Sequence, residues 1–128
     1  MTEGGTLVMR DEVWTLLLAR AAAWHSGNLE AIMAGYAPAV IFVAPGVRLE
    51  GLAALRENTQ RYLAAYTDIA VTLTRLILDG EQGALEWTWS ETRRADGRRH
   101  TVEDAIIFVL HKGQILYWRE YFDTAALA

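Results

Sequence analysis

The chain has 128 residues, of which 52% are hydrophobic and 22% charged, proportions typical of an ordinary globular protein. This length predicts a single domain over residues 1–128, with enough residues to form a real core. A net charge of −4 without a basic run argues against a nucleic-acid partner, and the absence of cysteine excludes disulfides, thiolate nucleophiles and cysteine-based metal sites.

The sequence contains no pattern that predicts a metal site, an organic cofactor or a membrane span. The three histidines, His25, His100 and His111, lie far apart and lack metal-ligand spacing. The first residues lack a basic region followed by an apolar block, and the apolar run from Val13 to Trp24 contains Arg20 and is too short to span a bilayer. We therefore expect a cytoplasmic protein without metal or organic cofactor, and without nucleic-acid or membrane partners.

The first half of the chain predicts helices around a short hairpin. A Leu- and Ala-rich segment that ends at Gly27 predicts a helix, and Asn28 is placed to cap a second, short one. A β-branched and aromatic run stopped by Pro45 and Gly46 predicts a strand. Apolar residues at helical spacing then predict a third helix. The predicted segments are helix 10–26, helix 29–34, strand 40–44, strand 47–50 and helix 52–66.

The second half predicts an antiparallel meander. Four strand-like runs are separated by the hairpin signals Asp79-Gly80, Asp96-Gly97 and Lys112-Gly113. Helices followed by a meander indicate an α+β fold, in which a curved sheet carries helices on one face. The four predicted strands cover residues 69–78, 84–94, 99–110 and 114–123.

The third of these strands suggests an interface. Its segment 105–110 is apolar at consecutive positions, which indicates cover on both faces, whereas the helices can cover only one. We expect the other face to meet a second copy of the chain, so that a homodimer forms through the sheet. Cover by the chain termini is the alternative. The candidate contact residues are Ile107, Val109, Ile115, Tyr117 and Tyr121.

The last strand places an acid among apolar side chains. Because successive side chains of a strand point to opposite faces, Glu120 shares a face with Leu116, Trp118 and Phe122. A carboxylate in such surroundings is paired, shifted in pKa, or functional.

Turn geometry gives this acid a partner. If Asp96-Gly97 is a two-residue turn and residues 111–113 form a three-residue turn, then Trp89, Asp104 and Glu120 form one row across three adjacent strands. Desolvation and a like charge both raise the pKa of such a pair, which then titrates as a unit. One partner is protonated and the other ionised, the arrangement that general acid–base chemistry needs near neutral pH.

We therefore predict that Glu120, Asp104 and Glu91 are catalytic. The predicted ligand-binding residues are Trp89, Trp87, Trp118, Phe122, Val102, Ile106, Phe42 and Tyr62. Two structural alternatives stay open. A one-residue bulge in either hairpin would turn Asp104 or Glu120 away from the pocket, and Arg75 could neutralise Glu91 as a structural ion pair.

The order of elements, together with Gly27–Ile32, Tyr36 and the ending Trp118–Asp123, resembles the SnoaL-like branch of the nuclear-transport-factor-2-like superfamily, over about residues 12–123. This resemblance implies a cone-shaped, cystatin-like α+β barrel in which three N-terminal helices wrap a curved mixed or antiparallel sheet. It also implies a deep apolar pocket between helices and sheet and usually a homodimer. The fold hosts isomerases, cyclases, hydrolases and binding modules, so it does not imply a single chemistry.

The limonene epoxide hydrolases of this superfamily have a similar terminal strand. That similarity implies that Glu120 takes the place of the aspartate that activates water, and Glu91 the place of the second acid. Their connecting arginine falls at Trp89, and their two water-holding residues fall at Phe42 and Ala44. The acid–arginine–acid relay is therefore broken in this chain.

The ketosteroid isomerases share a pattern close to Gly27–Ile32. The similarity implies that Asp104 takes the place of their protonated oxyanion-hole aspartate, which agrees with its inward direction. Their general base falls at Ala44, and their oxyanion tyrosine falls near Arg20. What remains from both comparisons is a pair of inward acids, with Glu91 nearby.

We expect an enzyme that uses these carboxylates for acid–base chemistry on an apolar, ring-bearing small molecule: isomerisation, cyclisation, or opening of an epoxide or other ring. The alternative from another class is a noncatalytic small-molecule-binding or assembly module of the same fold. A protein–protein adaptor would require a large exposed apolar patch beyond the dimer face.

Overall fold

The computed structural model describes the backbone of residues 2–127 and the side chains of residues 9–127. Its element order confirms the predicted α+β layout, in which helices precede a meander. The elements are α1 (Thr2–Ser26), α2 (Leu29–Met33), β1 (Tyr36–Ala44), β2 (Val47–Glu50), α3 (Leu52–Ala65), β3 (Tyr66–Asp79), β4 (Gln82–Arg93), β5 (Arg99–His111), β6 (Gln114–Tyr121) and a final 3-10 helix, η1 (Thr124–Leu127).

The junction between α1 and α2 follows the predicted capping residues. Gly27 adopts a φ of +67°, the left-handed conformation that commonly ends a helix, directly after Ser26. Asn28 then caps α2, because its Oδ1 accepts a hydrogen bond from the backbone N–H of Ala31 at 3.0 Å. Helix α1 begins at Thr2, earlier than predicted.

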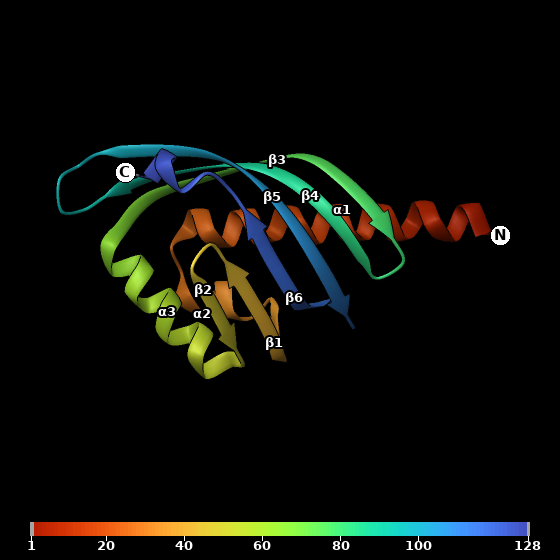
Figure 1. Ribbon diagram of the computed structural model, residues 1–128. Coiled ribbons are helices and arrows are strands. Elements are labelled where there is room, and N and C mark those ends of the chain that lie inside the picture. Colours follow the sequence, from red (N-terminus) through yellow and green to blue (C-terminus); the bar gives the residue numbers. More distant parts are fainter. Residues whose placement is uncertain (1, 128) are drawn as a thin grey trace.

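The six strands form one curved, open sheet in the order β2-β1-β6-β5-β4-β3. Neighbouring strands are antiparallel except β1 and β6, which run parallel. Figure 1 shows α1 lying along the concave side of this sheet, with α2 and α3 beside the β1–β2 hairpin. The mixed, curved sheet with helices on its inner side confirms the expected cone-shaped fold.

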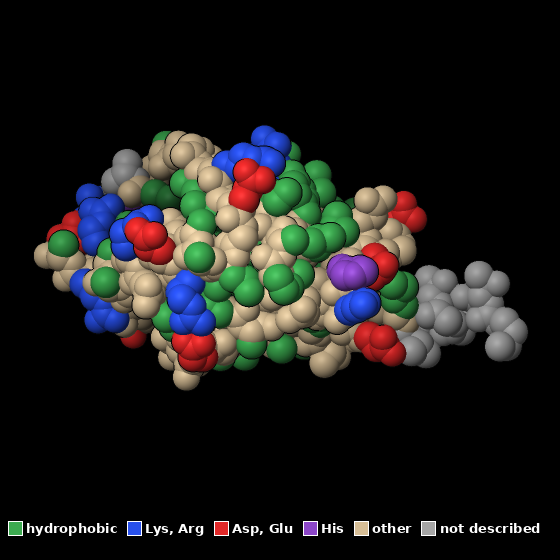
Figure 2. All heavy atoms as spheres, turned by 90° about the horizontal axis from the view of Figure 1, so that it is seen from below, with side chains coloured by type: hydrophobic (Ala, Val, Ile, Leu, Met, Phe, Trp, Pro, Cys, Tyr) green, Lys and Arg blue, Asp and Glu red, His purple; other side chains and the backbone are tan. Residues whose placement is uncertain are grey.

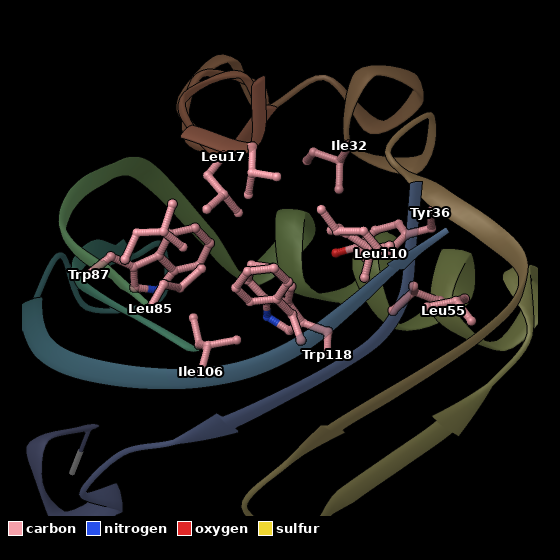
Figure 3. Packing of buried hydrophobic residues seen from close by; sticks show 14 of the residues in the cluster. Leu17, Ile32, Tyr36, Leu55, Leu85, Trp87, Ile106, Leu110 and Trp118 are labelled. Carbon is pink, nitrogen blue, oxygen red and sulfur yellow. The ribbon is translucent and has the colours of Figure 1, made fainter. Parts of the chain in front are cut away.

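The core fills the space between the helices and the concave face of the sheet. Figure 3 shows Leu17 of α1 and Ile32 of α2 pointing toward Trp87, Ile106 and Trp118 of the three central strands. These strands supply the core because every second side chain points inward, as the alternating burial along β5 shows.

The register between β4 and β5 differs from the prediction by two residues. A four-residue loop, residues 94–97, replaces the expected two-residue turn, and Gly97 takes the left-handed conformation there. Asp104 therefore lies opposite Trp87, and Trp89 lies opposite Val102. A shift of two keeps every side chain on its predicted face, so Asp104 still points inward.

Two departures from prediction compensate one another between β5 and β6. Lys112 and Gly113 both have positive φ and form a two-residue turn, where a three-residue turn was expected. That change alone would turn Glu120 outward. A one-residue bulge at Leu116 follows. Leu110 pairs with Ile115 and Val109 pairs with Tyr117, so Leu116 has no partner on β5. The bulge restores the inward direction of Glu120.

The predicted straight row of Trp89, Asp104 and Glu120 is consequently wrong. Glu120 lies opposite Ile106, so Asp104, two residues away on β5, is its diagonal neighbour. Diagonal neighbours on one sheet face remain within reach of long side chains.

Two further expectations need correction. Arg75 does not neutralise Glu91: a register irregularity precedes it in β3, and it is exposed opposite Glu86. Ile115 does not face outward, because the bulge that follows it leaves its side chain in the core with 1% of its surface exposed.

The described helices do not have the combination of length and apolar composition that a membrane span requires. On the face seen from below Figure 1, acidic side chains lie among the basic ones, with hydrophobic side chains between them (Figure 2).

Gly83 provides a test of the packing between β3, β4 and β5. A Cβ at this position would clash with the carbonyl oxygen of Ile77 and lie 3.0 Å from the ring of Phe108. We expect Gly83→Ala to lower the free energy of unfolding, measured in urea, by about 1–3 kcal/mol, because backbone must move to accept the methyl group. The neighbouring exposed Gln82→Ala is the control, with an expected change within about 0.5 kcal/mol. Equal stability of the two variants would contradict the observed strand contacts.

Candidate functional site

A cavity of about 290 Å³ opens between α3 and the concave face of the sheet, near the C-terminal end of α1. Its wall is mostly aromatic and aliphatic, with three acids, and none of the described lining residues is basic. The lining residues are Trp24, Phe42, Ala44, Val47, Asn58, Tyr62, Tyr66, Trp89, Glu91, Val102, Asp104, Glu120, Phe122 and Leu127.

All three predicted acids line this cavity, as do five of the eight predicted ligand-binding residues: Phe42, Tyr62, Trp89, Val102 and Phe122. The other three lie deeper. Trp87, Ile106 and Trp118 have 2%, 1% and 3% of their surface exposed and belong to the hydrophobic core beneath the cavity.

Trp87, Trp89 and Trp118 have a role that the sequence did not predict. Each of the three acids that point inward accepts a hydrogen bond from one of their indole N–H groups. Two of these pairs are two residues apart on one strand and therefore share a face. The third pair joins residues opposite one another on β4 and β5. The donors and acceptors are Trp89 Nε1 to Glu91 Oε1 at 2.8 Å, Trp118 Nε1 to Glu120 Oε2 at 2.9 Å, and Trp87 Nε1 to Asp104 Oδ2 at 3.4 Å.

Asp104 and Glu120 influence each other's ionisation. Burial raises the pKa of Asp104 from 3.8 to about 6, although the proximity of Glu120, the Trp87 indole and the Tyr121 backbone lowers it in part. Burial, followed by the negative charge of Asp104, raises the pKa of Glu120 well above its usual 4.5, and the indole of Trp118 opposes this. Glu120 is thus the protonated partner and can donate to Asp104. The buried Asp104 Oδ1 has no hydrogen-bond partner among the described residues.

Glu91 occupies a separate polar position on the cavity wall. Its Oε1 accepts a short hydrogen bond from the hydroxyl of Tyr62 as well as the bond from Trp89, whose indole also lies 3.0 Å from the Tyr62 oxygen. Burial and the hydrogen bond to Glu91 raise the pKa of Tyr62, so its phenol stays protonated and acts as a donor. Trp89 stands where the resemblance to epoxide hydrolases places an arginine, and it supplies a neutral donor there.

Several lining residues were not predicted. Trp24 and Tyr66 come from the end of α1 and the beginning of β3, and Asn58 comes from α3. Leu127 reaches the cavity from η1. Trp24 and Leu127 resemble ordinary core residues, and the sequence gives no signal that they reach the cavity. Asn58 and Tyr66 lie four residues before and after Tyr62, and this helical spacing could have indicated them.

The described His, Asp and Glu side chains form no group of three or more that could hold a metal ion. The cavity is instead an aromatic pocket with a coupled carboxyl pair on its floor, in a curved α+β sheet. This combination defines the class of the fold: a cone-shaped α+β domain with a cavity between its helices and a mixed sheet.

The chain belongs to the SnoaL-like domain family, whose model matches residues 18–118. The match ends just before Glu120. No curated protein matches the sequence at a significant level.

Solved structures share the fold at low sequence identity. A hypothetical protein of Catenulispora acidiphila with a ketosteroid isomerase-like fold, in complex with trimethylamine, has a TM-score of 0.79 and 18% identity over 87% of each chain. AclR of Streptomyces galilaeus, which carries the provisional name hydroxylase, has a TM-score of 0.77 and 17% identity over 93% of each chain. A Pseudomonas putida protein with the provisional name polyketide cyclase has a TM-score of 0.72 and 24% identity over 88% of this chain and 92% of its own. These similarities establish the fold.

The acid pair predicts an unusual dependence of stability on pH. Folding raises both pKa values above their usual 3.8 and 4.5, so above about pH 4 the folded state binds more protons than the unfolded state. The contribution of the pair to stability is therefore present at low pH and is lost as the pH rises through 6 and beyond. We expect Glu120→Gln to be more stable than the wild type at pH 8, by on the order of 1–3 kcal/mol, with little difference at pH 4.

Urea unfolding of both proteins from pH 4 to pH 8 measures this difference. Glu103→Gln is the matched control, because Glu103 is next to Asp104 on β5 but exposed on the opposite face. If the free energies of unfolding of Glu120→Gln and the wild type differ by the same amount at every pH in this range, the raised pKa of Glu120 is wrong.

Proposed function

We propose that the cavity binds an apolar, ring-bearing small molecule and that Glu120 and Asp104 perform acid–base chemistry on it. The observation that carries this proposal is the pair of neighbouring carboxyl groups, both with raised pKa, on the wall of a mostly aromatic and aliphatic cavity. Structural ion-pair networks also shift pKa values, but none of the described lining residues is a cation that could form one.

The pair divides the two catalytic roles. Near neutral pH Glu120 holds a proton, whereas Asp104, with a pKa of about 6, is mostly ionised. Asp104 is therefore the candidate general base, and Glu120 the candidate general acid that protonates a carbonyl or a carbon of the bound molecule. Both groups lie on a largely aromatic and aliphatic wall, where electrostatic effects on a developing charge are stronger than in water.

Among the candidate reactions, isomerisation and cyclisation agree best with the cavity wall. Each requires removal of one proton and delivery of another, which two neighbouring carboxyl groups can perform. Hydrolytic opening of an epoxide also needs a held water molecule, and Phe42 and Ala44 offer no side-chain hydrogen bond to hold it. The provisional name of one structural neighbour, polyketide cyclase, agrees with the cyclisation alternative.

A noncatalytic binding module is the second candidate. The hydrogen bonds of Glu91 favour it. Glu91 Oε1 accepts bonds from Tyr62 and Trp89, as the carboxylate of a structural residue would. Such a module would bind its ligand without any turnover that depends on Asp104 or Glu120.

Substitution of the acid pair separates these functions. On a substrate found by screening ring-bearing compounds, we expect Asp104→Asn and Glu120→Gln each to lower kcat by roughly 10²–10⁴-fold, because each removes one proton-transfer group while keeping its shape. The control Glu103→Gln should retain full turnover. The wild-type rate should rise through about pH 6 as Asp104 ionises and fall at the higher pH where Glu120 loses its proton. Full turnover by both variants would refute catalysis by the acid pair, and ligand binding without any turnover would favour the binding module.

We also propose that two copies of the chain pair through the convex face of the sheet. This face carries exposed apolar side chains, with Ile107 48% exposed and Tyr121 47% exposed at positions opposite the buried ones. A monomer would leave this surface in water.

Light scattering coupled to size-exclusion chromatography tests the pairing. We expect a dimer for the wild type and a monomer for Ile107→Glu, because the new carboxylate would be buried without a partner. Leu18→Glu on α1 is the control, since Leu18 is 47% exposed but lies on a helix. A monomeric wild type would refute the proposal.

A further inference from the structure

One end of the cavity is enclosed by aromatic rings in several orientations. Trp24 meets Tyr62 edge to face, with centroids 5.8 Å apart and planes at 89°, and it meets Trp89 at 5.2 Å and 70°. Tyr66 stacks on Tyr62 at 4.8 Å. All four residues line the cavity, so this part of its wall is aromatic. The faces of aromatic rings carry partial negative charge and attract cations.

Glu91 lies in the same part of the wall. Its Oε1 accepts the bonds from Tyr62 and Trp89, whereas its Oε2 accepts no hydrogen bond from any described residue. Neither Arg93, two residues along β4, nor His100 on β5 forms an ion pair with it. His100 lies opposite Glu91 on β5 and its Nε2 is 3.4 Å from Arg93, which itself pairs with Asp96.

The charge of the cavity has no counterpart in its described wall. Glu91, Asp104 and Glu120 all line it without a lysine, arginine or histidine, and the buried Asp104 Oδ1 has no hydrogen-bond partner. Ionised carboxyl groups without a cationic partner are unfavourable in a buried site, even where they accept hydrogen bonds. A ligand with a positive charge would offset this, whereas an anionic ligand would add to it.

We infer that the small molecule of the proposed function is an amine, and that its protonated or quaternary ammonium group binds between Glu91 and the rings of Trp24, Tyr62, Tyr66 and Trp89. This inference rests on the proposed function and names its ligand class. It makes Glu91 an anchoring residue rather than a catalytic one. His100 lies opposite Glu91 in the sheet, and Asp104 is four residues farther along β5. Four residues of a strand separate Glu91 from Asp104 by roughly 13 Å. An anchored amine therefore leaves its ring system directed toward the acid pair.

A matched pair of probes isolates the charge. Benzyltrimethylammonium and neopentylbenzene have the same shape and differ by the exchange of N⁺ for carbon. We expect the wild-type protein, in calorimetric titrations, to bind the cation at least about tenfold more tightly than the neutral probe.

Two variants place the preference at this end of the cavity. Glu91→Gln keeps the shape and a hydrogen-bonding oxygen but removes the charge, so affinity for the cation should fall roughly tenfold while affinity for neopentylbenzene stays the same. Trp24→Leu keeps an apolar wall but removes an aromatic face, so it should weaken the cation alone by roughly three- to thirtyfold. Asp104→Asn should keep the preference, since Asp104 lies at the other end. Circular dichroism shows whether each variant is folded.

The outcomes distinguish this inference from the proposed function. Equal binding of both probes would overturn the amine assignment and leave an apolar acid–base site intact. A preference that survives both Glu91→Gln and Trp24→Leu would overturn the placement of the cation between Glu91 and the aromatic rings. A preference lost in Asp104→Asn but kept in Glu91→Gln would overturn the placement of the cation. Failure of both probes to bind would overturn the inference, and turnover by the acid-pair variants would still decide the proposed function.

Discussion

The requirement to keep three carboxyl groups on the concave, largely apolar side of the sheet governs much of this structure. Desolvation of an acid is unfavourable unless hydrogen bonds replace its water. An indole N–H donates a hydrogen bond to each acid. In the pair of Asp104 and Glu120, the raised pKa of Glu120 favours its protonated form. This explains tryptophan, rather than phenylalanine, at positions 87, 89 and 118: the indole fills core volume and also donates a hydrogen bond. Core packing and site chemistry therefore depend on the same side chains.

The sequence was sufficient to predict the elements and the direction of the acids. Capping residues, hairpin glycines and alternation located nearly every helix and strand, because these signals are local. Strand register is not local. The loop at residues 94–97 and the bulge at Leu116 depend on how strands twist around the core, so the predicted row of Trp89, Asp104 and Glu120 failed. The inward direction survived because the errors shifted the pairing by an even number of residues.

The candidate site was predicted less completely than the fold. Tyr62 and Glu91 are 29 residues apart, and no periodicity links a helix residue to a strand residue across a cavity. Trp24 has the spacing of a core residue on α1, and its place in the wall depends on where that helix crosses the sheet. The family resemblance implied a pocket but transferred no complete set of catalytic residues. Chemistry in this fold is decided by a few side chains on a shared frame.

The bulge at Leu116 has a consequence for how such sites arise. It is a single additional residue in β6, and it alone decides whether Glu120 or Arg119 enters the cavity. Loss of that residue would turn the following side chains of β6 over together, so that Arg119 would face Asp104 while Glu120 and Trp118 would face the convex side. A change in strand length, without any substitution, can therefore invert the charge of the pocket floor. Relatives with the same terminal motif can differ in chemistry for this reason, and a comparison of motifs alone would not detect the difference.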